Sequence, residues 1–160
     1  MSQSRPSWQE QKKNYEKRQP LRWDDMEVGK KFEPFVFPIT EGLVNDLMET
    51  TGDRNPLYYD NEVAKRSPYG GRISPQATVV IYGRLAYLGE NHRPAPGGLS
   101  VGLSLQFVQP AKIGDVITST AVVTNREERK GRKYFSLRVE SFNQKGELVS
   151  IMEQTGISSS

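Results

Sequence analysis

The chain has 160 residues, contains no cysteine and carries a formal net charge of +3 at pH 7. This length fits one domain with its own core, and the lack of cysteine excludes disulfides, thiol catalysis and cysteine-based metal sites. No apolar run resembles a secretory signal or a membrane span, so we expect a cytoplasmic protein with no membrane partner.

The positive charge is concentrated in the first 22 residues. This segment holds six Lys or Arg side chains against two Glu, a net charge of +4, which leaves −1 for the rest of the chain. A nearly neutral body argues against nucleic acid as a partner. The basic segment is either a solvated arm or a contact to a partner subunit or an anionic ligand.

Residues 7–10 have the spacing of a capping box, which predicts a short helix from Trp8 toward Arg18, ended by Pro20. Trp8 and Tyr15 would share one face of this helix. So small an apolar surface does not hold a helix by itself. We therefore expect it to lie on the domain or on a neighbouring subunit.

After a turn-rich segment at 23–29, residues 31–39 alternate apolar and other side chains around two prolines, which predicts an edge strand. Thr40 is placed to cap a helix that ends at Gly52. Asp60 is placed to cap a further short helix. The first of these helices has apolar residues at helical spacing, namely Leu43, Val44, Leu47 and Met48.

Ser74 and Pro75 are typical of a helix start, with Ser as the cap and Pro at the first helical position. Residues 77–88 are apolar nearly all round, which indicates a helix enclosed by other structure. The following segment, 91–98, is predicted to be a loop. It contains the only histidine, His92, which we expect the helix to separate from Asp53.

From residue 100 onward, apolar residues recur at every second position, which predicts four strands. Asn143–Gly146 is predicted to be a hairpin turn, and Arg126–Lys133 a basic hairpin tip. An antiparallel sheet around one buried helix is an α+β arrangement. The expected strands are 100–108 (with Val101, Leu103, Leu105 and Phe107 on one face), 116–124, 133–141 and 148–156. We divide the chain into an arm (1–22), a single domain (23–157) and a tail (158–160).

The polar segment between the helix that ends at Gly52 and the helix that starts at Ser74 carries a motif. Residues 52–60, Gly-Asp-Arg-Asn-Pro-Leu-Tyr-Tyr-Asp, with Ala64 and Tyr-Gly-Gly-Arg-Ile at 69–73, resemble the hydratase signature of MaoC-like proteins. These are (R)-specific enoyl-thioester hydratases and dehydratases of the hot-dog fold, an antiparallel sheet around one long central helix. Residues 105–115 resemble the strand that follows in that family, and the whole resemblance runs from about Trp23 to Gly156.

The resemblance implies that Asp53 is catalytic on a bound acyl thioester and that Asn55 orients its neighbours. Tyr58 stands where the family has its catalytic His, and Ser74-Pro75-Gln76 stands where the family has Ala-His-Gly. We expect Tyr58 to act beside Asp53 and expect no metal or cofactor. The expected substrate-binding residues are Asn55, Gly71, Ser74, Gln76 and Ala77.

Tyrosine, with a pKa of about 10, is neutral at pH 7, so Tyr58 is a hydrogen-bond donor and a poor base. A chain that works alone therefore needs Asp53 as the base that activates water. The charge on the thioester oxygen also needs a donor. A backbone N–H at Gln76 or Ala77 would supply it, because Pro75 has none.

Plainer interpretations remain open at this point. Residues 53–56 fit a simple turn after a helix, Tyr58 fits a packing role, and the 126–133 tip is either solvated or in contact with coenzyme A phosphates. The resemblance implies a hydro-lyase acting on an enoyl-CoA, 3-hydroxyacyl-CoA or carrier-protein thioester. The alternatives are a non-catalytic acyl-CoA-binding or structural subunit of a heteromeric MaoC-like hydratase, and a hot-dog thioesterase. Because hot-dog domains generally pair, we expect a homodimer or a heteromer with another MaoC-like subunit.

Overall fold

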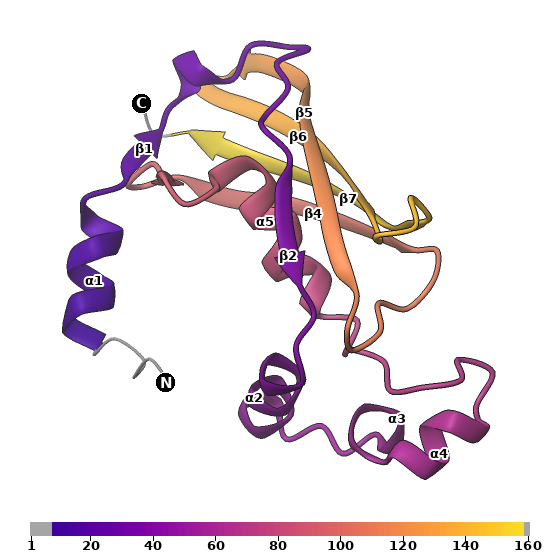
Figure 1. The fold of residues 1–160 in the computed structure, drawn as a ribbon. Coiled ribbons are helices and arrows are strands. Elements are labelled where there is room, and N and C mark those ends of the chain that lie inside the picture. Colours follow the sequence, from indigo (N-terminus) through magenta and orange to yellow (C-terminus); the bar gives the residue numbers. More distant parts are fainter. Residues whose placement is uncertain (1–7, 159–160) are drawn as a thin grey trace.

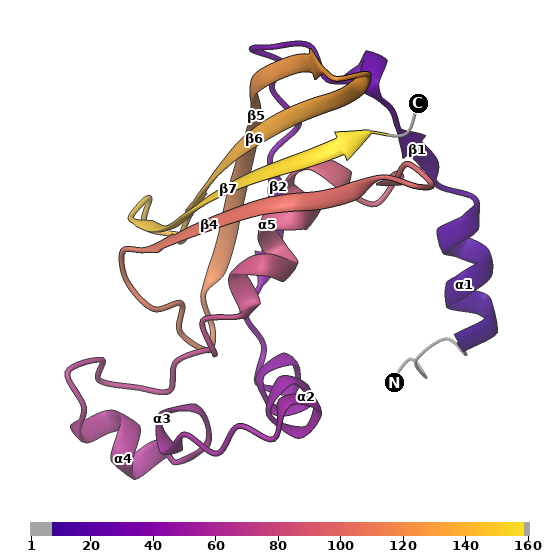
Figure 2. The same ribbon diagram turned by 180° about the vertical axis from the view of Figure 1, so that it is seen from behind.

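The structure, a computed structural model, describes residues 8–158 and confirms the α+β class. Its main sheet is antiparallel, with the strand order β2-β5-β6-β7-β4. Helix α5 (Thr78–Leu88) lies in the hollow of this curved sheet (Figures 1 and 2). This is the hot-dog arrangement that the resemblance implied. The strands are β2 (Phe35–Pro38), β4 (Leu99–Phe107), β5 (Val116–Arg129), β6 (Arg132–Phe142) and β7 (Leu148–Ser158).

The core lies between α5 and the sheet and has two parts. Near the start of α5, Val79 and Tyr82 pack with side chains of α2 (Glu41–Thr51), β2, β5 and β7. Near its end, Ala86 and Tyr87 pack with side chains of β5, β6 and β7. Apolar burial of this kind contributes about 25 cal/mol per Å² removed from water. The sheet therefore holds α5 along its whole length.

The expectation that α5 is enclosed on every side is wrong for the single chain. Ile81 and Leu85 are only half-buried, and Arg84 is exposed. A helix that is apolar nearly all round is stable only if most of its surface is packed against other structure. The sheet supplies that packing on one side, and part of the other side stays open.

Three short helices lie at the end of the sheet where α5 begins (Figure 1). Each has the cap that its sequence supplies: the side chains of Thr40, Asn55 and Asp60 accept backbone N–H groups in the first turn. Gly52 ends the first of them with a left-handed φ of 70°, as expected. The helices are α2 (Glu41–Thr51), α3 (Pro56–Tyr59) and α4 (Asn61–Arg66).

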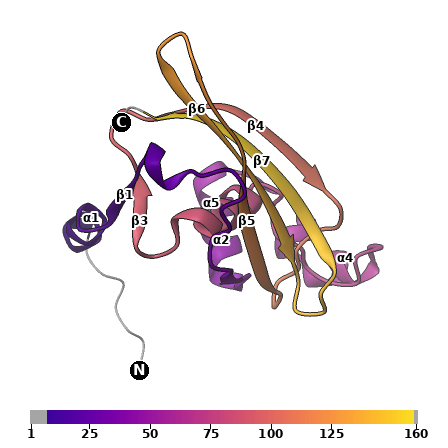
Figure 3. The same cartoon turned by 90° about the horizontal axis from the view of Figure 1, so that it is seen from above.

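The N-terminal segment contains helix α1 (Trp8–Glu16), strand β1 (Gln19–Leu21) and the 3-10 helix η1 (Trp23–Asp25). Figures 1 and 3 show α1 standing apart from the main sheet, and Tyr15 is 46% exposed. In the single chain α1 therefore does not lie on the domain. Ser7 of the expected capping box and the side chain of Trp8 lie outside the described residues.

The expectation that the segment 91–98 is only a loop is wrong. Its residues His92–Pro94 form strand β3, which pairs in parallel with β1. This pairing attaches the N-terminal segment beside the end of α5, and Leu21 is buried there. Three residues are too few to show an alternating pattern. The partner strand lies about 70 residues away in the chain, so the sequence gives no local sign of the pairing.

Two further boundaries differ from expectation because of local backbone geometry. The strand expected at 31–39 is regular only over Phe35–Pro38, since prolines cannot donate to the ladder. Ser74 and Pro75 do not form the cap and first residue of α5. They begin a turn with i→i+3 hydrogen bonds, such as Thr78 N to Pro75 O at 3.0 Å, and the α-helix follows at Thr78.

The strands predicted after α5 are present at the expected places, and three of them, β5, β6 and β7, are longer than expected. β5 and β6 continue into the segment that we had assigned to a hairpin tip, and the turn is confined to Lys130 and Gly131, with φ of 52° and 70°. The apolar face expected on β4 is largely exposed. Leu103, for example, is 51% exposed. β4 is an edge strand, so its outer side has no neighbour in the single chain.

Within residues 8–158, none of the helices combines the length and apolar content that crossing a bilayer requires. The same part of the chain contains no group of three or more His, Asp or Glu side chains placed to share a metal ion.

Candidate functional site

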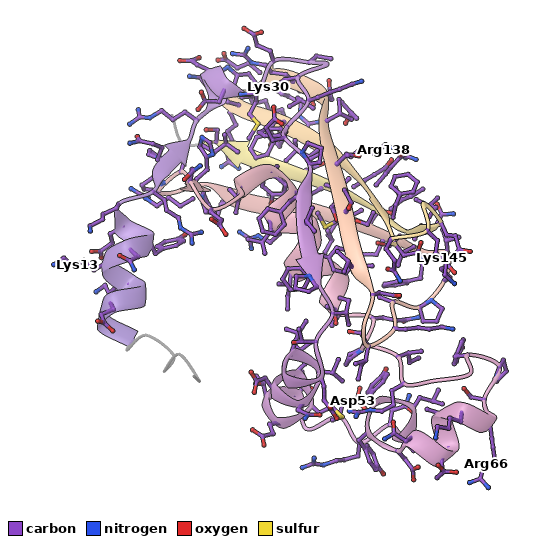
Figure 4. The ribbon with its side chains drawn as sticks, viewed as in Figure 1. Lys13, Lys30, Asp53, Arg66, Arg138 and Lys145 are labelled. Atoms are coloured by element: carbon purple, nitrogen blue, oxygen red, sulfur yellow. The ribbon has the colours of Figure 1, made fainter. Side chains whose placement is uncertain are left out.

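Asp53 lies in the loop between α2 and α3, at the end of the molecule opposite Lys30 (Figure 4). Its Oδ1 atom accepts the backbone N–H of Asn55 at 3.0 Å, and the Oδ1 atom of Asn55 accepts the backbone N–H of Leu57 at 3.0 Å. These are consecutive Asx turns, in which a side chain replaces a backbone acceptor. They fix both side chains relative to the backbone and leave both half-buried.

Tyr58 belongs to the same cluster. It lies half-buried against the apolar residues around the start of α5. Burial raises the pKa of the Tyr58 hydroxyl above its usual 10.0, the negative charge of Asp53 raises it further, and a hydrogen bond with Asn55 acts in the opposite direction. The hydroxyl is therefore protonated at neutral pH and able to donate a hydrogen bond beside a carboxylate.

Arg72 holds this loop against the rest of the protein. Its Nε donates to the carbonyl oxygen of Tyr58 at 2.7 Å, while its Nη1 and Nη2 atoms donate to Glu41 and Asn45 of α2. The side chain of Arg72 is only 9% exposed. Sequence reasoning included Arg72 in the motif but gave it no role. Its place after two glycines, on the approach to a buried helix, is the one signal that could have identified it.

The start of α5 forms the second part of the site. The backbone N–H of Ser74 donates to Ala111 at 2.8 Å, and the Ser74 hydroxyl is hydrogen-bonded to that of Thr78. Among the hydrogen bonds of the described residues, none uses the backbone N–H of Gln76 or Ala77 as a donor. Such N–H groups at a helix start attract negative charge.

A narrow cleft of about 20 Å³ opens beside this helix start. Ser74 and Gln76 line it together with Phe107 and Gln109 from β4 and the segment after it. Asp53 and Tyr58 do not line this cleft. In the single chain its volume is below that of ligand sites, which is typically about 300–1,000 Å³.

The structure thus brings the expected residues together in two groups. Asp53, Asn55 and Tyr58 form one polar cluster. Ser74 and Gln76 line the cleft, and Ala77 is exposed in the turn that follows. Gly71 lies half-buried directly before Arg72, in the segment that joins the two groups, where the backbone N–H of Ile73 donates to Leu57 at 3.1 Å. His92 is in β3, beside the other end of α5.

Comparisons with known proteins identify the family and the fold. The family model for FAS1-like dehydratase domain regions matches residues 26–152. A 3-hydroxybutyryl-CoA dehydratase of Methylorubrum extorquens is 32% identical over 97 residues, which cover 61% of this chain and 60% of the dehydratase. The matched part is therefore less than two thirds of that relative's length.

Two solved structures share the fold. An R-hydratase from Pseudomonas aeruginosa in unliganded form is 24% identical, with a TM-score of 0.73 over 88% of this chain and 87% of the hydratase. The HadBC (3R-hydroxyacyl-ACP dehydratase) complex from Mycobacterium tuberculosis includes a chain that is 19% identical, with a TM-score of 0.69 over 82% of this chain and 96% of that one.

Proposed function

Because this chain belongs to the family of FAS1-like dehydratase domain regions, we propose that it is an acyl-thioester hydro-lyase. The reaction is the addition of water to the C=C bond of a 2-enoyl thioester, or its reverse. The observation that carries the proposal is the half-buried Asp53 carboxylate held beside the protonated Tyr58 hydroxyl. The substrate is a thioester of coenzyme A or of a carrier protein.

Asp53 is the base in this proposal. It accepts a proton from water while the water oxygen forms a bond to the β-carbon of the enoyl group. The electron pair of the C=C bond moves toward the thioester carbonyl, and the same proton is then delivered to the α-carbon. Positioned acid–base groups of this kind contribute about 10²–10⁴-fold to a rate. The Asx turn with Asn55 supports this role, because it occupies one carboxylate oxygen, Oδ1, and fixes the direction of the other.

Tyr58 takes the place of the family's histidine as a hydrogen-bond donor. Its raised pKa keeps it neutral, so it orients the attacking water or the thioester oxygen and does not remove a proton. Asn55 supports both groups, since it is hydrogen-bonded to Tyr58 and adjacent to Asp53. The three residues act as one unit in the proposal.

The start of α5 supplies the other half of the site. Negative charge develops on the thioester oxygen during water addition, and preorganised N–H groups stabilise it. The backbone N–H groups of Gln76 and Ala77 are placed for this task at the N-terminal end of α5. We assign Gly71 and Ser74 to the substrate-binding wall between this helix start and the Asp53 loop.

We propose that the complete pocket forms between two chains. The outer edge of β4 has no partner in the single chain and exposes apolar side chains. Phe107 at the end of β4 also lines the cleft beside Ser74. Pairing along β4, with a second copy or a related chain, therefore closes that cleft.

A second candidate function is favoured by one observation, the tyrosine at position 58. A chain without the family's histidine is suited to be the acyl-binding or structural subunit of a heteromeric hydratase. A solved heteromeric dehydratase, the HadBC complex, includes a chain of the same fold. Co-expression with a His-bearing homologous chain tests this candidate, because stable co-purification and activity only in the mixture would replace the first proposal.

The test of the first proposal is a substrate assay with purified protein. Crotonyl-CoA and longer 2-enoyl-CoA esters are incubated with the chain, and loss of enoyl absorbance is followed together with release of free thiol. We expect hydration without thiol release. Thiol release would identify a thioesterase, and no reaction on any ester, alone or with a related chain, would contradict the proposal.

A further inference from the structure

A cavity with a mostly apolar lining lies at the end of α5 opposite the Asp53 loop. It has a volume of about 250 Å³. At about 1.5 Å per residue, the eleven residues of α5 separate it from the helix start by roughly 16 Å. Its apolar walls come from the N-terminal segment, the end of α5 and strands β6 and β7, with Leu21, Met26, Tyr87, Leu88, Phe135 and Ile157 among them.

One end of this cavity is polar. The hydroxyl of Tyr87 donates to Oε1 of Gln154 at 2.8 Å, and Arg84 is hydrogen-bonded to the same hydroxyl. Burial raises the pKa of Tyr87, so this network is neutral except for the guanidinium. A guanidinium has five N–H donors. Among the ion pairs of the described residues, none includes Arg84, and Arg84 is exposed.

The apolar wall opposite depends on a glycine. Phe135 of β6 pairs with Gly156 of β7, and a Cβ atom at position 156 would collide with the Phe135 ring. The far end of the ring therefore lies over the glycine, and Phe135 also lines the cavity. Aromatic rings cover strand glycines in this way in other sheets.

We propose that this cavity binds the aliphatic tail of a small amphipathic anion, such as a medium-chain carboxylate, with the negative head at Arg84. The volume lies just below the range of about 300–1,000 Å³ found for drug-sized ligands, so a small molecule fits. The cationic, hydrogen-bonding rim and the apolar interior match such a molecule at its two ends. The site is separate from Asp53, and the proposal does not rest on the hydratase assignment.

Binding is measured by calorimetry on the full chain, with butyrate, hexanoate and octanoate as probes and octan-1-ol as the uncharged counterpart. Each buried methylene is expected to tighten binding by about fourfold. Affinity should therefore rise from butyrate to octanoate. Equal affinity for all three acids, or no binding of octanoate, would overturn the proposal.

Two variants locate the ligand. Arg84→Gln, at an exposed position, should weaken octanoate binding by about tenfold and leave octan-1-ol unchanged. Ala95→Phe, which places a ring into the cavity from its loop, should abolish binding of both probes. Arg66→Gln on α4 is the matched control and should change neither. Octanoate binding that survives both variants would place the ligand elsewhere and overturn the proposal. Binding that is seen only when chains are dissociated would also overturn the proposal, because the cavity would then be part of a contact between subunits.

Discussion

The Nε atom of Arg72 donates a hydrogen bond to the backbone carbonyl oxygen of Tyr58 at 2.7 Å. The same guanidinium is bonded to Glu41 and Asn45 on α2. One side chain, only 9% exposed, therefore connects α2, α3 and the segment that leads into α5. The position of Tyr58 beside Asp53 depends on this connection.

Replacing Arg72 by Ala should lower the free energy of unfolding by about 2 kcal/mol, because hydrogen bonds to charged groups contribute about 1.5–3 kcal/mol and the Tyr58 carbonyl would lose its partner. Urea unfolding measures the change. Lys65→Ala is the control, since the ion pair of Lys65 with Glu62 is exposed on both sides and its loss should cost less than about 0.5 kcal/mol. Equal losses in the two variants would show that Arg72 does not hold the loop.

Asn55 has two separable roles that two substitutions distinguish. Asn55→Ala removes the acceptor of the Leu57 N–H and should cost about 1 kcal/mol in the free energy of unfolding. Asn55→Asp keeps an oxygen at that place, so its stability at neutral pH should stay close to that of the original chain. The added charge should raise the pKa of Tyr58 further. Urea unfolding and ultraviolet titration of tyrosine measure the two effects, and an Asp variant as unstable as the Ala variant would disprove the capping role.

Buried tyrosines should make the fold less stable at alkaline pH. Burial raises the pKa of Tyr82 and of Tyr87 above the usual 10.0. Between the unfolded and folded pKa values the folded chain holds more protons, so this stabilisation is present below about pH 10 and is lost as the pH rises through the folded pKa.

Tyr82→Phe removes one of these protons and should make the alkaline decline in stability shallower. It also removes the hydrogen bond to Ser150, at 3.0 Å, which should cost about 1 kcal/mol at pH 7. Urea unfolding from pH 7 to pH 11 measures both effects. A decline as steep as in the original chain would show that Tyr82 does not contribute.

The sequence predicted features that depend on near neighbours in the chain. Thr40, Gly52 and Asp60 act within their own helices, so their spacing was sufficient to predict them. The Asp53–Asn55 turn is equally local. The alternation of apolar and polar residues predicted β4 to β7 for the same reason, because it is visible within a single strand.

Features that depend on distant partners could not be predicted in this way. β3 exists because β1 pairs with it, and the role of Arg72 appears only when Glu41 and Asn45 are brought to it by folding. The start of α5 was misplaced because Pro75 begins a turn with i→i+3 hydrogen bonds and the α-helix begins only at Thr78. The cavity beside Arg84 combines residues of five separate segments and has no sequence signal.

The exposed edge of β4 leads to a prediction about assembly. Leu103→Lys places a charge in the middle of this edge and should prevent pairing between chains, because charged edge residues oppose strand addition. Sedimentation velocity should show a smaller species than the original chain, with the same circular dichroism spectrum. Leu103 is already exposed, so the monomer should stay folded. An unchanged sedimentation coefficient would show that β4 is not the contact.

The most direct test of the central proposal compares two neighbouring carboxylates in the hydration of crotonyl-CoA or a longer 2-enoyl-CoA. Asp53→Asn keeps an oxygen for the Asn55 N–H but removes the base, and we expect the rate to fall by about 10²–10⁴-fold. Asp60→Asn makes the same chemical change at the α4 cap, where an amide oxygen also caps, and should keep nearly full activity. Hydration by Asp53→Asn at the rate of the original chain would contradict the assignment of Asp53 as the base.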